Sequence, residues 1–321
     1  MPAIKSELDF LKAISNRPRL ADSLLGIGDD AAVVRGRQGV YAITTDMMVE
    51  GDHFSLDYFT PFDIGVKAME SNVSDIAAMG ATPLFAFISI ALKPGTSMDF
   101  VKDFYRGLYA SAKKRGVDVL GGDTTHGPTM VVNITIIGYA KSAKGLVYRS
   151  GARAGDLIFV TGMLGASTAG LKLFLNKIPG HAYVKAKHRR PCCRLDISDK
   201  IAGIANSMED VSDGLASEVR NICHESGKGA VIYAENVPID GRTIKAARAA
   251  GNSALDYALF GGEDFELVYT VPKRLGKQAA KFGTLVGEIT PQKGKIFLLL
   301  NGKKELLTHF GYDHFSKVPG K

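Results

Sequence analysis

Six short acidic segments recur along the 321 residues, and each places a carboxylate beside glycine, serine or threonine. They are Gly28-Asp29-Asp30, Thr44-Thr45-Asp46, Asn72-Val73-Ser74-Asp75, Gly121-Gly122-Asp123, Asp210-Val211-Ser212-Asp213-Gly214 and Gly262-Glu263-Asp264. Carboxylates that converge in one cleft repel each other, so they need to be neutralised. Mg²⁺ is suited to this, because it binds carboxylate and water oxygens together with substrate phosphates. The pattern therefore predicts several metal ions around a polyphosphate.

Each segment taken alone has a simpler explanation. Residues 28–30 also fit a solvated turn, Asp75 fits a salt bridge or a cap, and residues 210–214 fit the N-cap of the next helix. Residues 44–46 are expected to end a strand. Residues 121–125 are expected to lie between a helix and a strand, where paired glycines let the backbone approach a phosphate. Recurrence along one chain favours the metal and phosphate interpretation over six separate explanations.

The elements that must position these segments follow from hydrophobic periodicity. Residues 61–79 and 98–115 form amphipathic helices, the second beginning after Ser97 as N-cap and ending at Gly116. Asn72 and Asp75, three residues apart, share one face of the first helix. Further helices are expected after residue 165 and at 196–205, 214–226 and 243–250. Strands are expected at 40–44, 85–92, 131–139, 157–161, 230–234, 266–271 and 296–300.

Length and composition indicate an α/β (α+β) protein of two domains. A single hydrophobic core rarely serves 321 residues, and the turn-rich segment at 148–156 divides the chain into residues 1–150 and 151–321. Hydrophobic content of 45% and charged content of 23% are typical of a globular protein. No apolar run reaches the roughly 20 residues of a membrane span, and residues 1–11 lack the apolar core of a secretory signal. A cytoplasmic location without membrane contact is expected.

The cysteines and the net charge do not indicate a disulfide framework, a zinc site or a nucleic-acid partner. Cys192, Cys193 and Cys223 are odd in number and lack structural-zinc spacing, so free thiols are expected. The net charge of +7 raises the question of nucleic acid, but the densest basic run is one short segment, residues 185–190. That segment fits a solvated loop, or a loop that attracts a small anion. No nucleic-acid partner is expected.

The sequences of these motifs and their order resemble those of one known family along nearly the whole chain. The segments are GDDAA at 28–32, TTDMMVEGDHF at 44–54, KAMESNVSDIAAMGATP at 67–83, GGDTT at 121–125, YRSGARAGD at 148–156, DVSDGL at 210–215, GGEDFEL at 261–267 and GYDHF at 311–315. They resemble the thiamine-monophosphate kinase family, within the superfamily of aminoimidazole ribonucleotide synthetase and selenophosphate synthetase.

The resemblance implies an N-terminal mixed-sheet domain that binds ATP and metal and pairs in a homodimer, and a C-terminal α/β domain that closes over the substrates. It also implies the site residues. The metal ligands, direct or through water, would be Asp29, Thr44, Thr45, Asp46, Asp75, Asp123, Asp210 and Asp213. The ATP contacts would be Tyr105, Gly122, Asp123, Arg149 and Ser212. The contacts to thiamine monophosphate would be His53, Glu263 and Tyr312.

The implied reaction transfers the γ-phosphoryl group of ATP to thiamine monophosphate, directly and in line, with several Mg²⁺ ions. The acceptor is already an anionic phosphate oxygen, so no catalytic base or covalent nucleophile is expected. Two alternatives stay open: another ATP-dependent enzyme of the superfamily, similar to aminoimidazole ribonucleotide synthetase, and a non-catalytic nucleotide sensor.

Overall fold

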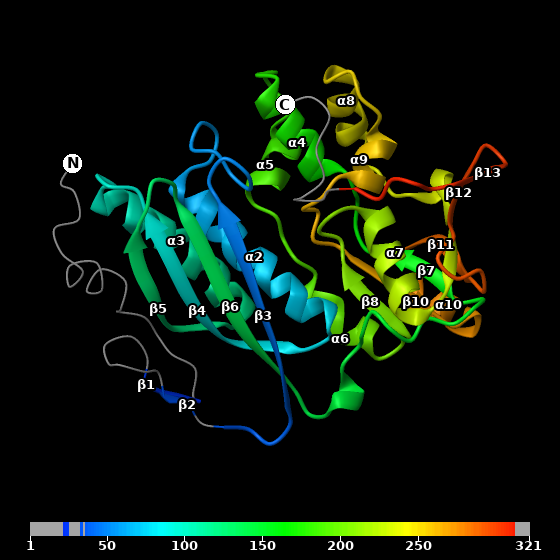
Figure 1. The fold of residues 1–321 in the computed structure, drawn as a ribbon, viewed down its shortest axis with the longest axis horizontal. Helices are drawn as coiled ribbons and strands as arrows, with labels where there is room; N and C mark the ends of the chain where they lie inside the picture. Colours follow the sequence, from blue (N-terminus) through cyan, green and yellow to red (C-terminus); the bar gives the residue numbers. More distant parts are fainter. Residues whose placement is uncertain (1–21, 26–32, 35, 312–321) are drawn as a thin grey trace. The chain divides into compact units, whose positions relative to one another are not determined.

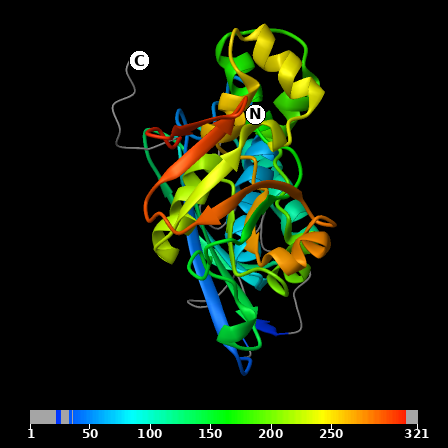
Figure 2. The ribbon, with the colours of Figure 1, turned by 90° about the vertical axis from the view of Figure 1, so that its right-hand side faces the viewer.

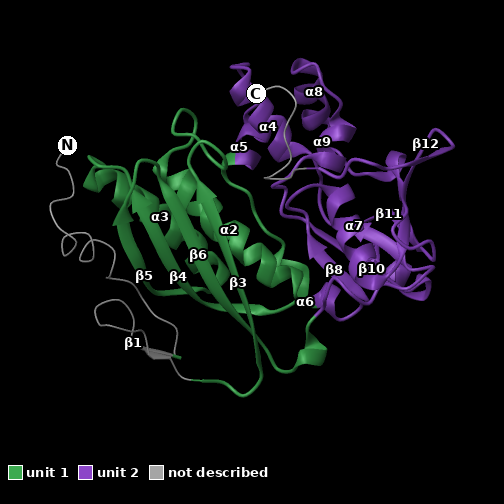
Figure 3. Cartoon of the chain, in the orientation of Figure 1, with its two compact units in different colours: residues 1–146, 189–199 green, residues 147–188, 200–321 purple. Residues whose placement is uncertain are grey.

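The computed structural model describes residues 22–25, 33–34 and 36–311, and it divides the chain into two compact units (Figures 1 and 3). Unit 1 contains residues 1–146 and 189–199, and unit 2 contains residues 147–188 and 200–321. The segment 189–199 thus belongs to unit 1 although it lies within the expected C-terminal half. No helix in the described part of the chain has the length and apolar character that a membrane crossing requires.

Unit 1 is a four-stranded mixed sheet with two long helices packed on one face (Figure 1). Its sheet order is β3-β6-β4-β5. The pairs β3–β6 and β4–β6 are antiparallel, whereas β4 and β5 are parallel and joined through α3. The strands and helices of this layer are β3 (Val40–Val49), α2 (Pro61–Ala78), β4 (Thr82–Leu92), α3 (Met98–Arg115), β5 (Asp118–His126) and β6 (Val131–Ala140). A short antiparallel pair, β1 (Ser23–Leu25) and β2 (Val33–Val34), and the 3₁₀ helix η1 (Ala143–Gly145) complete it.

Local sequence explains both long helices of unit 1. Thr60 and Asp63 form a capping box at the start of α2, and Pro61 occupies its first turn. The side chain of Ser97 accepts from the N–H of Phe100, and Gly116 ends α3 in a left-handed conformation with φ of 70°. The predicted apolar stripe of α2 is buried against the sheet and α3. The predictions for these two helices are confirmed.

Unit 2 holds a seven-stranded sheet with the order β13-β12-β9-β11-β7-β10-β8. Figure 2 shows strands of this sheet facing the viewer, in colours from yellow-green to red. Of its described pairs, β12–β9 is parallel and the others are antiparallel. The strands are β7 (Leu157–Val160), β8 (Ser207–Asp210), β9 (Gly229–Tyr233), β10 (Leu267–Val271), β11 (Thr284–Thr290), β12 (Ile296–Leu300) and β13 (Lys303–Leu306). The helices that accompany them are α4 (Ala166–Leu175), α5 (Ala182–Arg189), α7 (Leu215–Ser226), α8 (Gly241–Ala249), α9 (Ala254–Phe260) and α10 (Gly276–Ala279), with 3₁₀ turns η2 (Ala234–Asn236) and η3 (Lys273–Leu275). Helix α6 (Leu195–Ala202) spans the division, with residues 195–199 in unit 1 and residues 200–202 in unit 2.

Two apolar clusters hold unit 2 together. The larger joins α7 to the central strands through residues such as Leu215, Val219 and Val268. The smaller joins α4 to α8 through Leu173 and Ala246. Most predicted strands and helices of this half are present with shifts of one to three residues at their ends.

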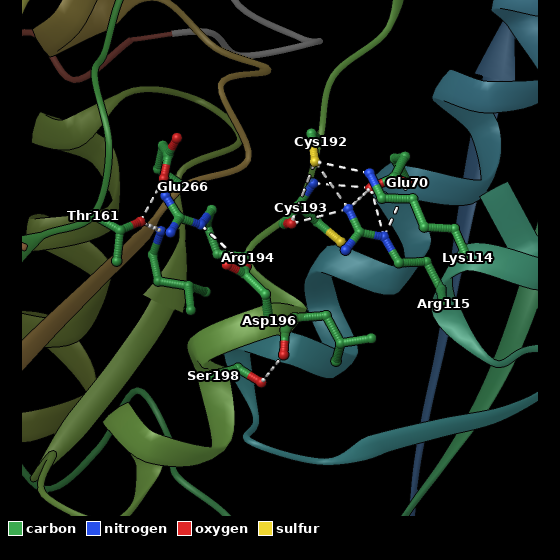
Figure 4. Close-up of polar contacts among 12 residues, drawn as sticks. Glu70, Lys114, Arg115, Thr161, Cys192, Cys193, Arg194, Asp196, Ser198 and Glu266 are labelled. Carbon is green, nitrogen blue, oxygen red and sulfur yellow. Dashed lines mark hydrogen bonds and ion pairs between the residues drawn. The ribbon is translucent and has the colours of Figure 1, made fainter. Parts of the chain in front are cut away.

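The segment 189–199 is attached to unit 1 by buried charges (Figure 4). Glu70 on α2 and Arg115 on α3 form an ion pair with Oε2 and Nη2 2.5 Å apart, and their side chains are only 3% and 6% exposed. The backbone N–H of Cys193 donates to Glu70 Oε2 at 2.9 Å, and Arg115 Nη2 donates to the Cys193 carbonyl at 3.1 Å. Burial alone would raise the pKa of Glu70, but Arg115 and the other donors lower it below its usual value. These contacts anchor segment 189–199 to α2 and α3, and they join residues that are far apart in sequence.

Candidate functional site

In unit 1, predicted metal ligands on β3 and α2 lie together. Thr44 donates its hydroxyl hydrogen to Asp75 Oδ2 at 2.6 Å, and the N–H of Asp46 donates to Asn72 Oδ1 at 3.0 Å. Asn72 and Asp75 therefore both face β3, as their spacing predicts. Carboxylate, amide and hydroxyl oxygens are gathered here between a strand and a helix, which is a ligand set that suits a hard cation.

The expectation that residues 44–46 end a strand is wrong. They lie in the middle of β3, whose pairing with β6 continues to Val49 opposite Val131. The strand tolerates these polar residues because Thr44 and the backbone of Asp46 find partners on α2. Residues 121–125 likewise lie within β5, paired with β4, and not between a helix and a strand.

Two other predicted metal ligands lie on the opposite, outer face of the sheet. Asp123 pairs with Ser89, Ser89 with Asn133, and Asn133 with Met47, and residues paired in one row share a face. Thr45 is on this face too, and its hydroxyl donates to Asn133 Oδ1 at 3.1 Å. The structure thus groups Thr44, Asp46 and Asp75 on the helix side, with Thr45 and Asp123 on the other.

The predicted ATP contacts of unit 1 differ in accessibility. Gly122 is exposed with φ of 153°, and a Cβ there would lie 1.7 Å from the Ile88 carbonyl oxygen, so only glycine fits. Tyr105 is only 3% exposed within α3, and burial raises the pKa of its hydroxyl. Gly122 presents its backbone to solvent, whereas Tyr105 is part of the core; its predicted contact with ATP stays a prediction.

His53, a predicted substrate contact, lies in the loop after β3. Its Nδ1 accepts from the N–H of Val49 at 3.2 Å. Lys67 on α2, which is almost fully buried, donates from Nζ to the His53 carbonyl at 2.8 Å. This loop is therefore held in place by a buried cation on the helix that also carries Asp75.

In unit 2, the Asp210–Gly214 segment is a loop held by a glutamate. It follows β8 directly and enters α7. Glu218, in the first turn of α7, accepts at Oε1 from the N–H of Ser212 at 2.9 Å and from the N–H of Asp213 at 2.6 Å. The simpler explanation of this segment, an N-cap at Ser212 or Asp213, is wrong: the N-cap is Gly214, which makes no side-chain cap bond. Glu218 reaches back and satisfies the loop amides instead.

A second glutamate, Glu209, contacts the predicted ATP-binding Arg149. Glu209 Oε1 lies 3.0 Å from Arg149 Nε and accepts from Asn221 Nδ2 at 3.0 Å. Burial raises the pKa of Glu209 to about 7, partly opposed by Arg149. The exposed guanidinium of Arg149 is thus oriented by a buried carboxylate.

Two glutamates in this part of unit 2, Glu209 and Glu218, are buried close to the carboxylates of Asp210 and Asp213. Burial raises the pKa of Glu218 well above its usual value, and the nearby Glu209, Asp213 and Asp210 raise it further. Within the described residues, Glu218 Oε2 and Glu209 Oε2 are buried without a hydrogen-bond partner. Such groups favour a neighbouring cation.

The segment at residues 261–264 is a tight loop before β10. A Cβ on Gly262 would lie 2.1 Å from the Ser212 carbonyl oxygen, so glycine allows this loop to approach the Asp210–Gly214 loop. The N–H of Glu263 donates to the same Ser212 carbonyl at 2.7 Å, and Glu263 has a positive φ of 65°. Unit 2 therefore brings predicted metal, ATP and substrate residues side by side: Asp213, Ser212 and Glu263.

Two predicted site residues, Asp29 and Tyr312, lie outside the described residues. In addition, the structure shows partners that sequence reasoning missed: Lys67, Glu209, Glu218, Ser167 and His188. Glu218 had one available signal, an acidic residue in the first turn of a helix beside loop amides. The other four residues contact site residues only in the folded chain, so no local sequence pattern identifies them.

The residues fit Mg²⁺ bound with a polyphosphate better than a metal held by protein alone. No group of three or more His, Cys, Asp or Glu side chains able to hold one ion occurs among residues 22–25, 33–34 and 36–311. Mg²⁺ commonly uses only one or two carboxylates and completes its shell with water and phosphate oxygens. The Thr44–Asp75 group and the carboxylates around Glu218 offer such oxygens, and the unpartnered Oε2 of Glu218 is consistent with a cation nearby.

The fold and these sites match a known class. Residues 28–140 match the model of the AIR synthase related protein N-terminal domain, and residues 153–298 match that of the corresponding C-terminal domain. The two matched domains define the class of the chain as an AIR synthase related protein.

Relatives and solved structures narrow the class. Thiamine-monophosphate kinase of Bacillus subtilis is 36% identical over 96% of this chain and 99% of its own length, and that of Escherichia coli K12 is 34% identical over 92% and 93%. The solved structure of AaThiL complexed with AMPPCP and TMP has a TM-score of 0.78 and 32% identity, covering 86% of this chain and 87% of that one. The chain belongs to the thiamine-monophosphate kinase family, and it is a kinase.

Proposed function

We propose that this chain transfers the γ-phosphoryl group of ATP to the phosphate of thiamine monophosphate, giving thiamine diphosphate and ADP. Family membership supports the choice of substrates, since a related structure is complexed with AMPPCP and TMP. The observation that carries the proposal is the oxygen group of unit 1, in which Thr44 and Asp75 are bonded and Asp46 is held by Asn72.

The main obstacle to this reaction is electrostatic. Both substrates are polyanions, and two unit charges 4 Å apart at an effective dielectric of ~20 repel by about 4 kcal/mol. Magnesium ions, when bound, supply the positive charge that lets the two phosphates approach and that stabilises the transferring group. We assign Asp46 and Asp75 in unit 1, and Asp210 and Asp213 in unit 2, to hold them. Thr44, Thr45, Asp123 and Asp29 are proposed as further ligands, directly or through water.

The remaining residues have positioning and recognition roles in this proposal. Arg149, oriented by Glu209, presents a planar guanidinium to an ATP phosphate. Ser212, Gly122 and Tyr105 are proposed as further ATP contacts. Glu263, His53 and Tyr312 are proposed to contact thiamine monophosphate, where a carboxylate and an aromatic ring suit a cationic thiazolium. The attacking atom is an anionic phosphate oxygen, so no side chain has to remove a proton from it.

We also propose a homodimer formed through the outer face of the unit 1 sheet. Among the described residues, α2 and α3 pack on one face of this sheet, and the other face exposes large apolar side chains, with Ile43 67% and Met47 54% exposed. Large apolar side chains exposed on one sheet face are typical of an interaction surface. The partner we propose is a second copy of this chain. A cytoplasmic location, where ATP is available, remains the expectation.

The function is tested by supplying the purified chain with ATP, Mg²⁺ and either thiamine monophosphate or free thiamine. We expect thiamine diphosphate from the monophosphate and no phosphorylated product from thiamine, since thiamine offers only a neutral hydroxyl. Asp46→Asn should abolish the reaction, whereas Asp57→Asn, at an exposed position in the same unit, should not. Absence of product from both acceptors, with ATP still bound, would favour the nucleotide-sensor alternative.

A further inference from the structure

The carboxylate of Glu263 lies over a buried serine–histidine pair. Its Oε2 is 3.3 Å from His188 Nδ1 and accepts from Ser167 Oγ at 3.5 Å, while Ser167 Oγ and His188 Nδ1 are 3.1 Å apart. His188 is only 2% exposed, whereas the side chain of Glu263 is 26% exposed. The three atoms form a triangle in which two buried polar groups meet one oxygen of a partly accessible carboxylate.

The backbone around Glu263 is fixed independently. The next residue, Asp264, accepts at Oδ2 from the N–H of Gly165 at 2.5 Å and at Oδ1 from the N–H of Ser167 at 3.1 Å, at the start of α4. The N–H of Phe265 donates to the Val211 carbonyl at 2.9 Å. Glu263 and Phe265 both have positive φ, at 65° and 51°, a conformation that costs free energy in residues other than glycine.

This arrangement restricts the Glu263 side chain more than is usual for a partly exposed glutamate. Glutamate side chains rotate freely when accessible, and ordering one costs conformational entropy. Here a strained loop, the start of α4 and two buried side chains all limit Glu263, yet part of its side chain remains open to solvent. A carboxylate fixed in one orientation is prepared to recognise an N–H donor or a cation with little further cost.

We propose that Ser167 and His188 are positioning residues that orient the Glu263 carboxylate toward the organic, cationic part of the phosphate acceptor. The inference rests on the proposed function, and it deepens it by assigning acceptor recognition to a three-residue unit. Neither Ser167 nor His188 needs to touch the acceptor. This role requires a form of His188 that carries a hydrogen on Nδ1, so that Nδ1 and the Ser167 hydroxyl both donate to Glu263 Oε2.

The test measures binding of thiamine monophosphate by calorimetry in the presence of AMPPCP and Mg²⁺, using the full chain. Ser167→Ala should weaken this binding about tenfold, the cost of one buried hydrogen bond to a charged group, and leave AMPPCP binding unchanged. His188→Leu should act in the same direction. His188→Asn should recover most of the loss, because the amide nitrogen of Asn replaces Nδ1 as a donor.

A matched control is Ser207→Ala. Ser207 is also a fully buried serine of unit 2, but its hydroxyl is bonded to Thr270 at 2.7 Å, with no carboxylate involved. It should lower the melting temperature as Ser167→Ala does and leave binding of thiamine monophosphate unchanged. A second readout is the double variant: in a Glu263→Gln background, Ser167→Ala should weaken binding far less than it does alone.

Three outcomes of these binding measurements would contradict the positioning role of Ser167 and His188. Equal binding of thiamine monophosphate by wild type, Ser167→Ala and His188→Leu overturns the positioning role and leaves the proposed function standing. Parallel weakening of AMPPCP and acceptor binding also overturns it, because it indicates a general structural effect. No binding of thiamine monophosphate by the wild-type chain with AMPPCP bound removes the proposed function itself, and this inference with it.

Discussion

Thr44 on β3 and Asp75 on α2, which are 31 residues apart, share a hydrogen bond of 2.6 Å between Thr44 Oγ1 and Asp75 Oδ2. The bond joins two acidic motifs of the sequence in one place. It also fixes the orientation of a carboxylate proposed to bind metal, because a carboxylate that accepts one hydroxyl is restricted in rotation.

Thr44→Val keeps the β-branched shape that suits the strand and removes the hydroxyl. We expect kcat/KM to fall by about ten- to a hundredfold, in the range found for residues that orient metal ligands. Raising the Mg²⁺ concentration should recover part of the loss. Thr82→Val, the same change at an exposed position of β4, is the control and should have no effect. Equal activity of the two variants would contradict the orienting role.

Glu218→Ala removes the acceptor for the N–H groups of Ser212 and Asp213. We expect the free energy of unfolding to fall by about 1–3 kcal/mol, because these partly buried N–H donors are left without a partner. Binding of AMPPCP should weaken in addition, because the loop that carries Ser212 is released. Glu225→Ala, at an exposed position of the same helix, should change neither quantity. Unaltered nucleotide binding by Glu218→Ala would show that the loop keeps its conformation without Glu218.

Arg115→Met breaks the buried pair with Glu70 (Figure 4). Removing one partner leaves a buried charge, so the free energy of unfolding should fall by about 3–5 kcal/mol in chemical denaturation. Arg106→Met, on the exposed face of the same helix, should cost less than about 1 kcal/mol. If the two variants were equally stable, the anchor of segment 189–199 would not depend on this ion pair.

Asp264 gives the stability of the chain a pH dependence. Burial raises its pKa in the native state to about 7 from 3.8, against the opposing effect of the N–H groups of Gly165 and Ser167. The native state therefore binds more protons than the unfolded state between these values, and the contribution of Asp264 to stability is lost as the pH rises from about 4 to about 7. Asp264→Asn should flatten the decline in melting temperature between pH 5 and pH 7. Identical slopes for wild type and variant would exclude Asp264 as the source.

Ile43→Lys places a charge on the outer face of the unit 1 sheet. If this face joins two copies of the chain, sedimentation should show a dimer for the wild type and a monomer for Ile43→Lys. Ile244→Lys, at an exposed isoleucine of α8 in unit 2, should remain dimeric. A wild-type monomer at all concentrations would contradict the proposed homodimer.

The sequence predicts most of the elements because their signals are local. Ser97 and Gly116 mark the ends of α3, and the apolar stripe of α2 follows its helical period. The sequence-based prediction fails at β3 and β5, where polar residues proposed for the site lie inside strands. Pairing with β6 and β4 continues through them, and this stabilisation comes from distant parts of the chain.

The sequence predicts the acidic residues proposed for the site, but not the buried residues that hold them. Acidic motifs identify Asp46, Asp75 and Asp213 because their residue types suit metal and phosphate. Glu218, Ser167 and His188 have no such pattern, since each acts through a contact that exists only after folding. The attachment of segment 189–199 to unit 1 is of the same kind, because Glu70 and Cys193 are 123 residues apart.

The direct transfer of a phosphoryl group is tested with ATP radiolabelled in its γ-phosphoryl group, supplied with Mg²⁺ and thiamine monophosphate. The label should appear in thiamine diphosphate, one for each ADP formed, with none retained on the protein. Release of the label as inorganic phosphate, without labelled thiamine diphosphate, would contradict the account and favour a different ATP-dependent enzyme of the same superfamily.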